Sequence, residues 1–378
     1  MLKLEQLSYW EKKTYFEELD FLVIGAGIVG SSTALHLRQK YPAAKILVVE
    51  RNFLPAGAST KNAGFACFGS VTELIDDLSK MSENDVWETV AERWEGLKYL
   101  RELIGDANLD FQGFGSWDLI RNDENSTLEK CLEKLPYLNQ RIATITGVQN
   151  VYSLDNNVKE KFGFNTIQSA FHNKLEGQID TGKMMVRFHQ LLSEQGIYLL
   201  TGIDVLELSS TEKQVEIQSN IGPFNASKVA ICVNGFAQRF LPKNDILPAR
   251  AQVIITKKID NLPFKGTFHY QDGYYYFRNI NDRVLFGGGR NLDFQGETTT
   301  EIDNSDVILN QLEKLLKEII LPKTPFEIDY AWAGIMGVGK SKKPIIELVK
   351  PNIAVGVRMG GMGVAIGTTV GRNVAKLL

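Results

Sequence analysis

The chain has 378 residues, of which 44% are apolar and 23% charged, as in a globular protein with a large core. Its 42 basic residues nearly balance 45 acidic ones, and this formal charge of −3 argues against a nucleic-acid partner. Three scattered cysteines, without a CxxC pair, argue against disulfides and structural zinc. With neither an apolar leader nor an apolar span, the sequence predicts a cytoplasmic protein without a membrane segment.

The N-terminal region predicts one βαβ unit. Buried strands are predicted at 20–24 and 45–49, with a helix at 31–40 between them. The first strand runs into Gly25-Ala26-Gly27-Ile28-Val29-Gly30, a GxGxxG pattern, and Glu50 ends the second strand. Such a turn brings pyrophosphate to the helix N-terminus, while the acidic residue accepts hydrogen bonds from a ribose. The pattern alone fits either FAD or NAD, and a glycine turn without a ligand is the alternative.

The later elements alternate between helical and β patterns. The predicted helices cover 71–105, 127–145, 181–195, 305–319 and a final segment to Leu378. The predicted strands cover 115–120, 196–200, 205–208, 215–217, 229–233, 252–255, 274–278, 284–286 and 353–357. This order indicates two interwoven domains rather than two consecutive ones.

The loop Ala58-Ser59-Thr60-Lys61-Asn62-Ala63-Gly64 brings the first clear family resemblance. Together with the glycine pattern, it resembles the D-amino-acid oxidase superfamily, which includes glycine oxidase, sarcosine oxidase and γ-glutamylputrescine oxidase. Further segments similar to that superfamily follow in its order: 177–180, 231–235, 248–252, 274–278 with 285–288, and 360–364. The resemblance therefore extends over nearly the whole chain.

This resemblance implies an α/β chain with two domains and FAD as cofactor. A Rossmann-like FAD-binding domain is expected at 1–90, 150–235 and 328–378, and an α+β substrate domain with a mixed sheet at 91–149 and 236–327. The flavin-tethering cysteine of sarcosine oxidases, near position 336, is absent, so we expect noncovalent FAD. The expected cofactor-binding residues are Gly25, Gly27, Ile28, Val29, Gly30, Glu50, Arg51, Ser59, Thr60, Asn62, Ala63, Gly64, Val205, Asn234, Gly235, Gly334, Arg358, Gly360, Gly361, Met362, Gly363 and Val364.

The predicted strand at 274–278 supplies the candidate catalytic residues. Because side chains alternate along a strand, Tyr274, Tyr276 and Arg278 share one face, which we expect to meet the flavin cavity. Ordinary sheet core is the alternative for each tyrosine. Met336 stands where amino-acid oxidases of this superfamily have an arginine that binds the substrate carboxylate. Either Arg278 or Arg358 replaces that arginine, or the substrate lacks a nearby carboxylate.

The expected reaction is oxidation of a C–N bond in a small amine or amino acid, giving an imine. The residues leave the electron acceptor open, as O2 or as another acceptor used by a dehydrogenase. The polyamine-type members also lack the arginine, which favours a secondary amine or a γ-glutamyl-polyamine-like substrate. A flavin domain acting in RNA modification, a flavin protein without activity and an NAD-dependent dehydrogenase are the alternatives. No HExxH or other metal-ligand motif occurs, so no metal is expected.

Overall fold

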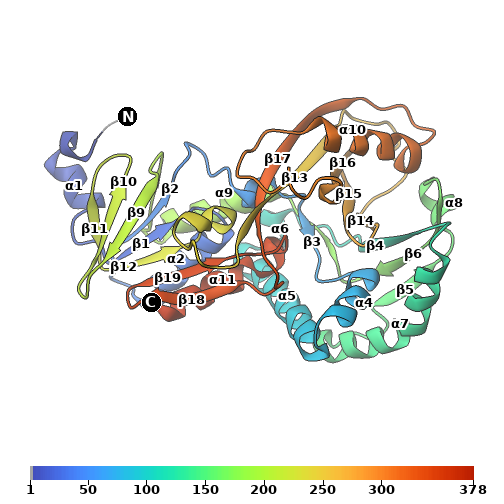
Figure 1. Cartoon of the computed structure of the whole chain (residues 1–378), viewed down its shortest axis with the longest axis horizontal. Helices are drawn as coiled ribbons and strands as arrows, with labels where there is room; N and C mark the ends of the chain where they lie inside the picture. Colours follow the sequence, from blue (N-terminus) through green and yellow to red (C-terminus); the bar gives the residue numbers. More distant parts are fainter. Residues whose placement is uncertain (1–2) are drawn as a thin grey trace.

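A largely parallel sheet forms one half of the molecule and a mixed sheet forms the other half (Figure 1). The computed structural model describes residues 3–378. The parallel half has the strand order β18-β19-β12-β1-β2-β8, in which only β18 is antiparallel to its neighbour. These strands are β1 (Phe21–Ile24), β2 (Ile46–Glu50), β8 (Tyr198–Thr201), β12 (Lys228–Ile231), β18 (Ile345–Lys350) and β19 (Ile353–Val357).

The order of this sheet creates a crevice between β1 and β12. The chain leaves β1 toward β2 and β8 and then returns to β12 on the other side of β1. Strand order reverses there, and ligands of open α/β sheets bind at such a point, outside the carboxyl ends of the strands. Residues 21–24 of β1 are all buried, which explains their unbroken apolar run.

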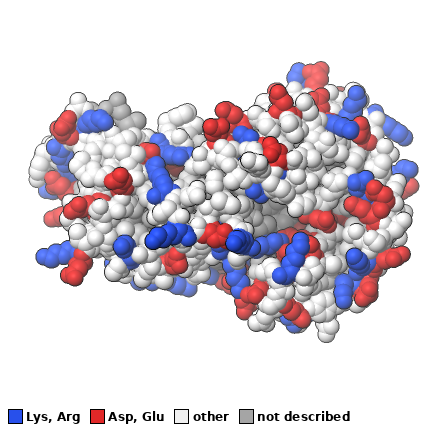
Figure 2. Space-filling model, in the orientation of Figure 1, with Lys and Arg blue, Asp and Glu red and all other residues white. Residues whose placement is uncertain are grey.

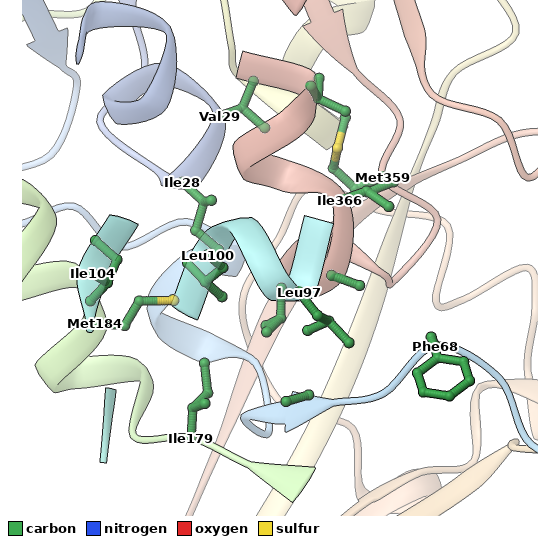
Figure 3. Close-up of a cluster of buried hydrophobic side chains, with 14 of the residues drawn as sticks. Ile28, Val29, Phe68, Leu97, Leu100, Ile104, Ile179, Met184, Met359 and Ile366 are labelled. Atoms are coloured by element: carbon green, nitrogen blue, oxygen red, sulfur yellow. The ribbon is translucent and has the colours of Figure 1, made fainter. Parts of the chain in front are cut away.

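Helices cover one face of the parallel sheet. They are α2 (Ile28–Lys40), α5 (Glu83–Ile104), α9 (Thr181–Glu194) and α11 (Gly363–Leu377), of which α11 contacts both α2 and α5. Figure 3 shows side chains from these helices meeting in one apolar cluster, with Ile28, Leu97, Met184 and Ile366 among them. This cluster fixes the helix that follows the glycine turn.

A second, smaller layer covers the opposite face of that sheet. It consists of the antiparallel strands β9 (Val205–Ser210), β10 (Val215–Ser219) and β11 (Phe224–Ala226), beside α1 (Tyr9–Tyr15). Val215 and Ile217 pack there with Leu22 and Leu47 of the parallel strands. The parallel sheet is therefore buried on both faces.

The mixed sheet has the strand order β17-β13-β16-β15-β14-β4-β6-β5. Its strands are β4 (Ser116–Arg121), β5 (Tyr152–Asp155), β6 (Ile167–Asn173), β13 (Leu247–Thr256), β14 (Thr267–Tyr270), β15 (Tyr275–Ile280), β16 (Arg283–Gly288) and β17 (Ile328–Val338). Only the β14–β4 pair is parallel. One face carries an aromatic core that includes Phe268 and Phe277, beside α8 (Val158–Phe162) and α10 (Asp306–Leu315).

The other face of the mixed sheet meets α4 (Val71–Lys80) and α7 (Asn125–Thr146). Short elements complete the chain: α3 (Ala58–Lys61), β3 (Phe65–Ala66), α6 (Asp106–Leu109), β7 (Gly177–Gln178), the 3-10 turns η1 (Leu4–Gln6), η2 (Asn234–Arg239) and η3 (Arg290–Leu292), and a π-helical turn (Leu316–Ile320). Within residues 3–378, every helix is too short or too polar to cross a bilayer.

The predicted fold class is confirmed, with a Rossmann-like half and a mixed-sheet half. Sheet membership corrects the expected ranges in two places. Strands β5, β6 and β17 belong to the mixed sheet, although they fall in the ranges 150–235 and 328–378 expected for the cofactor domain. Strand β17 belongs to the mixed sheet because it pairs with β13 along its whole length, from Ile328 to Val338. The remaining domain boundaries stay a prediction.

Candidate active site

A cavity of about 1350 Å³ extends from the carboxyl ends of β1 and β2 to the mixed sheet. Seventeen of the expected cofactor-binding residues line it: Gly25, Gly27, Ile28, Val29, Glu50, Arg51, Ser59, Asn62, Ala63, Val205, Asn234, Gly334, Gly360, Gly361, Met362, Gly363 and Val364. Tyr274, Tyr276 and Met336 line it as well. One continuous space therefore joins the predicted cofactor residues to three of the predicted catalytic residues.

The glycine turn leaves no room for side chains. Gly25 has a φ of +102°, and a Cβ atom there would lie 2.7 Å from the carbonyl oxygen of Cys232. A Cβ on Gly30 would overlap the carbonyl oxygen of Gly25. Close packing of the helix on the strand thus depends on both glycines, and it brings the first turn of α2 to the cavity.

The acidic residue at the end of β2 lies beside this turn. The Glu50 carboxylate accepts hydrogen bonds from the backbone N–H groups of Ala26 (3.4 Å) and Asn52 (3.2 Å). The guanidinium of Arg51 lies 3.8 Å from the ring centroid of Phe236, another residue of the cavity wall. Carboxylate, cation and aromatic ring together suit a ribose and an adenine.

The second glycine loop leads into α11. Gly360 and Gly361 have φ values of +57° and +85°, and Met362 provides no side-chain cap for the helix. The first helical residues, Gly363 and Val364, line the cavity. The N–H groups at the start of this helix favour negative charge nearby, which suits the N1–C2=O edge of a flavin. Both ends of the cavity therefore fit FAD.

Five of the expected cofactor residues do not line the cavity: Gly30, Thr60, Gly64, Gly235 and Arg358. They support its walls instead. The Thr60 hydroxyl donates to the carbonyl oxygens of Pro55 and Gly57, which shapes the loop before α3. The Asn234 side chain accepts from the backbone N–H groups of Arg358 and Met359, which joins η2 to the second glycine loop.

The structure corrects the expectation that Arg278 or Arg358 replaces the missing carboxylate clamp. Nη1 of Arg278 donates to the carbonyl oxygens of Gly64 (2.9 Å) and Ile179 (2.8 Å), and the residue does not line the cavity. Arg358 donates to Asp245 and to the carbonyl oxygen of Lys343. Both side chains are buried and neither lines the cavity. Their hydrogen bonds hold backbone segments in place, so neither guanidinium is available to a substrate carboxylate.

Aromatic rings form the inner wall on the mixed-sheet side. The ring of Phe65 lies 5.6 Å from that of Tyr276 and 5.3 Å from that of His269. Burial raises the pKa of Tyr276 to about 12, so this phenol stays neutral at pH 7. Tyr274, two residues earlier, is 45% exposed and stands at the mouth of the cavity. Tyr275 and Phe277 point into the aromatic core, as the alternation predicts.

His269 is a polar residue of this inner wall that is absent from the candidate catalytic residues predicted from the sequence. Burial lowers the pKa of His269 to about 4, so the imidazole is neutral at pH 7. Its Nε2 atom is buried and has no hydrogen-bond partner among residues 3–378. The register of β14 with β15 sets His269 opposite Tyr276, a pairing that the sequence did not reveal because β14 has only four residues.

Cys67, Glu176 and His269 come together behind this wall, with one atom from each within 4.8 Å of the others. The Glu176 carboxylate already accepts from the N–H groups of Phe68 and Gly69 and from the Ser116 hydroxyl. Burial and the nearby carboxylate raise the pKa of the Cys67 thiol well above its ordinary value, which disfavours a thiolate ligand. The contacts favour a hydrogen-bonded wall over metal ligation, and the absence of a metal stays a prediction.

The Rossmann-like half, the mixed sheet and the shared cavity define a flavin-dependent oxidoreductase. The chain belongs to the DAO family of FAD-dependent oxidoreductases, whose model matches residues 20–377. The probable oxidoreductase OrdL of Haemophilus influenzae is 22% identical over 387 residues, which cover 97% of this chain and 84% of that protein. These findings confirm the predicted superfamily, the FAD cofactor and the enzyme class.

Solved structures show the same fold. L-proline dehydrogenase from P. horikoshii has a TM-score of 0.73 at 19% identity, covering 96% of this chain and 93% of that chain. Glycine oxidase from Geobacillus kaustophilus has a TM-score of 0.74 at 15% identity, covering 95% and 94%. Iminodiacetate oxidase from Chelativorans sp. BNC1 has a TM-score of 0.73 at 18% identity, covering 94% of each chain.

Proposed function

We propose that the protein oxidises a C–N bond of an amine or amino acid to an imine. The observation that carries this proposal is the continuity of the cavity, which joins the dinucleotide end to Tyr276 and the neutral His269. Bound FAD supplies the two-electron acceptor for the hydride. The names of the similar structures, which include a proline dehydrogenase and a glycine oxidase, support the same substrate class.

The chain's own residues prepare the amine for oxidation. A substrate amine is protonated in water, and the half-buried aromatic wall of Phe65, Tyr276 and His269 disfavours that positive charge, so the amine releases its proton to the solvent as it enters. Nε2 of His269 is a neutral acceptor without a partner, and we assign it the amine N–H. The neutral amine then carries the lone pair that stabilises the developing imine. Tyr276 contributes an apolar ring face and a neutral hydroxyl.

The proposed cofactor contacts divide between the two glycine segments. The N terminus of α2 and the Ser59 loop would hold the pyrophosphate, and Glu50 the ribose. The first turn of α11 would lie at the flavin edge. Cys67 and Cys232 line the cavity as free, buried thiols with raised pKa values, and we propose that neither attaches the flavin. Acid precipitation that leaves FAD in the supernatant would support this noncovalent binding.

Charges on the face drawn in Figure 2 are interspersed, with acidic and basic side chains side by side. This distribution supports a small-molecule substrate rather than RNA. The three free cysteines support a reducing compartment such as the cytoplasm. We propose O2 or another electron acceptor as the second substrate.

Anaerobic flavin bleaching tests the proposed function. FAD-loaded protein is mixed under nitrogen with primary amines, secondary amines, N-methyl amino acids, and L- and D-amino acids. Loss of the flavin absorbance with any of these classes, and an imine or carbonyl product, would support the proposal. Failure of the whole panel to bleach a flavin that dithionite still reduces would reject it. Mixing the reduced protein with O2 then distinguishes an oxidase from a dehydrogenase.

A further inference from the structure

Arg290 lies on the cavity wall at its outer end, immediately after β16. It begins η3 and lines the same cavity as Tyr274 and Phe294. Its guanidinium lies 5.1 Å from the ring centroid of Phe294, which covers one face of the planar group. The edge of the guanidinium, where its N–H donors point, is left for another partner.

Apart from the Phe294 ring, Arg290 has no side-chain hydrogen-bond or ion-pair partner among residues 3–378. Its Nε atom is buried without a hydrogen bond, and no ion pair or hydrogen bond involves its guanidinium within that range. The nearby carboxylate of Glu297 is already occupied. Nε and Nη2 of Arg250 donate to it at 2.9 and 2.8 Å, and the Gln252 amide donates at 2.8 Å. Arg290 is thus a partly desolvated cation that faces the cavity.

Two lysines on the facing helix and loop are already paired with carboxylates. Lys80 pairs with Asp76 at 2.7 Å, and Lys342 pairs with Asp77 at 2.6 Å. All four of these residues line the cavity. Their charges cancel locally, so an incoming anion meets more net attraction at Arg290 than at either lysine.

The position of Arg290 also separates the proposed anion site from the site where the amine is oxidised. Strand β15 begins at Tyr275, one residue later than predicted, so Tyr274 lies in the preceding turn, and its Cα atom is at most about 7 Å from that of Tyr276. Tyr276 and His269 form the inner wall, whereas Tyr274 and Arg290 stand near the mouth. A molecule that reaches both groups therefore carries its amine and its anion several bonds apart.

Resting on the proposed function, we propose that Arg290 binds a carboxylate of the substrate at the outer end of the cavity. The substrate class is then an amine with a carboxylate remote from the oxidised C–N bond. A planar guanidinium with open N–H donors matches a carboxylate through two parallel hydrogen bonds. This arrangement supplies at the mouth the anion recognition that Met336 cannot supply within the cavity.

Binding of matched probes tests Arg290 without requiring turnover. Valerate and valeramide have the same chain and differ in charge, and calorimetry with the FAD-loaded protein at pH 7 gives the Kd of each. We expect valerate to bind at least tenfold more tightly than valeramide, Arg290→Gln to abolish this preference, and Arg290→Lys to retain part of it. Equal binding of the two probes, or an unchanged preference in Arg290→Gln, would overturn the proposal.

Arg283→Gln is the matched control. Arg283 is the first residue of β16, the strand that Arg290 follows, and it pairs with Asp329 outside the cavity. It should keep the preference for valerate. Flavin bleaching by 5-aminovalerate and by pentylamine then tests the substrate class, and faster bleaching by 5-aminovalerate should depend on Arg290. If the general amine panel fails while valerate binding depends on Arg290, the proposed function falls and the anion site stands. If amines bleach the flavin but valerate binding is independent of Arg290, only the anion site falls.

Discussion

The hydroxyl oxygen of Ser59 accepts a hydrogen bond from the backbone N–H of Ile28 at 3.0 Å, which joins the 57–64 loop to the first turn of α2. The same oxygen lies 2.7 Å from the point where a Cβ atom on Gly27 would stand. Gly57 has nearly the same backbone conformation as Gly27, with φ of −79° against −77°. Nothing lies within 4 Å of a Cβ atom at position 57. The two glycines differ in their surroundings rather than in their backbone.

Gly27→Ala should therefore weaken FAD binding, whereas Gly57→Ala should not. The added methyl group at 27 displaces Ser59 and blocks approach of a pyrophosphate to the helix N-terminus. We expect at least a tenfold rise in the Kd for FAD, measured by quenching of flavin fluorescence on titration of the apoprotein. Equal affinities for the two alanine variants would contradict this account of the turn.

The sequence predicted well what depends on local periodicity. The βαβ unit was visible as apolar runs around the glycine turn, and alternation along β15 separated Tyr276 from Phe277. The sequence did not predict which side chains on that face of β15 reach the cavity. Arg278 shares a face with Tyr276, but the chain segments at 64 and 179 cover it and take its hydrogen bonds.

Long-range pairing set the remaining parts of the site. His269 meets the cavity because β14 pairs with β15 and, in parallel, with β4, about 150 residues earlier in the chain. No local pattern marks that partnership. Arg290 was not predicted for a related reason. A single arginine after three glycines does not indicate whether the folded chain places a carboxylate beside it.

His269→Leu should slow flavin reduction by about tenfold, because leucine cannot accept the hydrogen bond from the amine N–H that we assign to His269. The pKa of His269 is lowered to about 4, so the wild-type imidazole stays neutral above that pH. The wild-type rate between pH 6 and 9 should therefore follow the substrate amine, without an inflection near 6.5. Anaerobic stopped-flow mixing over that range measures both effects, and unchanged FAD binding serves as the control. A histidine-dependent inflection near pH 6.5 would count against the assignment.

Glu297→Gln should destabilise the fold by about 3 kcal/mol, because it leaves the buried Arg250 without its charged partner. The Glu297 side chain is 1% exposed and accepts from both Arg250 and Gln252. The matched control is Glu327→Gln, which breaks the exposed pair with Lys257 and should leave stability unchanged within error. Urea unfolding at pH 7 compares them. Similar unfolding midpoints for the two variants would show that burial does not make the first pair critical.

Asp118→Asn should make stability less dependent on pH. Asp118 is 3% exposed, and it accepts hydrogen bonds from the backbone N–H (2.8 Å) and the hydroxyl (3.1 Å) of Thr72. Burial raises the pKa of Asp118 from 3.8 to about 7. Between these values the folded protein holds a proton that the unfolded chain has lost, so the free energy of unfolding falls as pH rises.

The asparagine side chain cannot ionise and escapes that loss. Relative to the wild type, Asp118→Asn should gain about 2 to 3 kcal/mol in the free energy of unfolding between pH 5 and pH 8. Urea unfolding at the two pH values measures the change. The exposed Asp260 provides the control, and its Asn variant should follow the wild type at both pH values. If the free energy of unfolding of Asp118→Asn instead falls relative to that of the wild type as pH rises, Thr72 stabilises the buried group as a carboxylate, and burial does not hold it neutral.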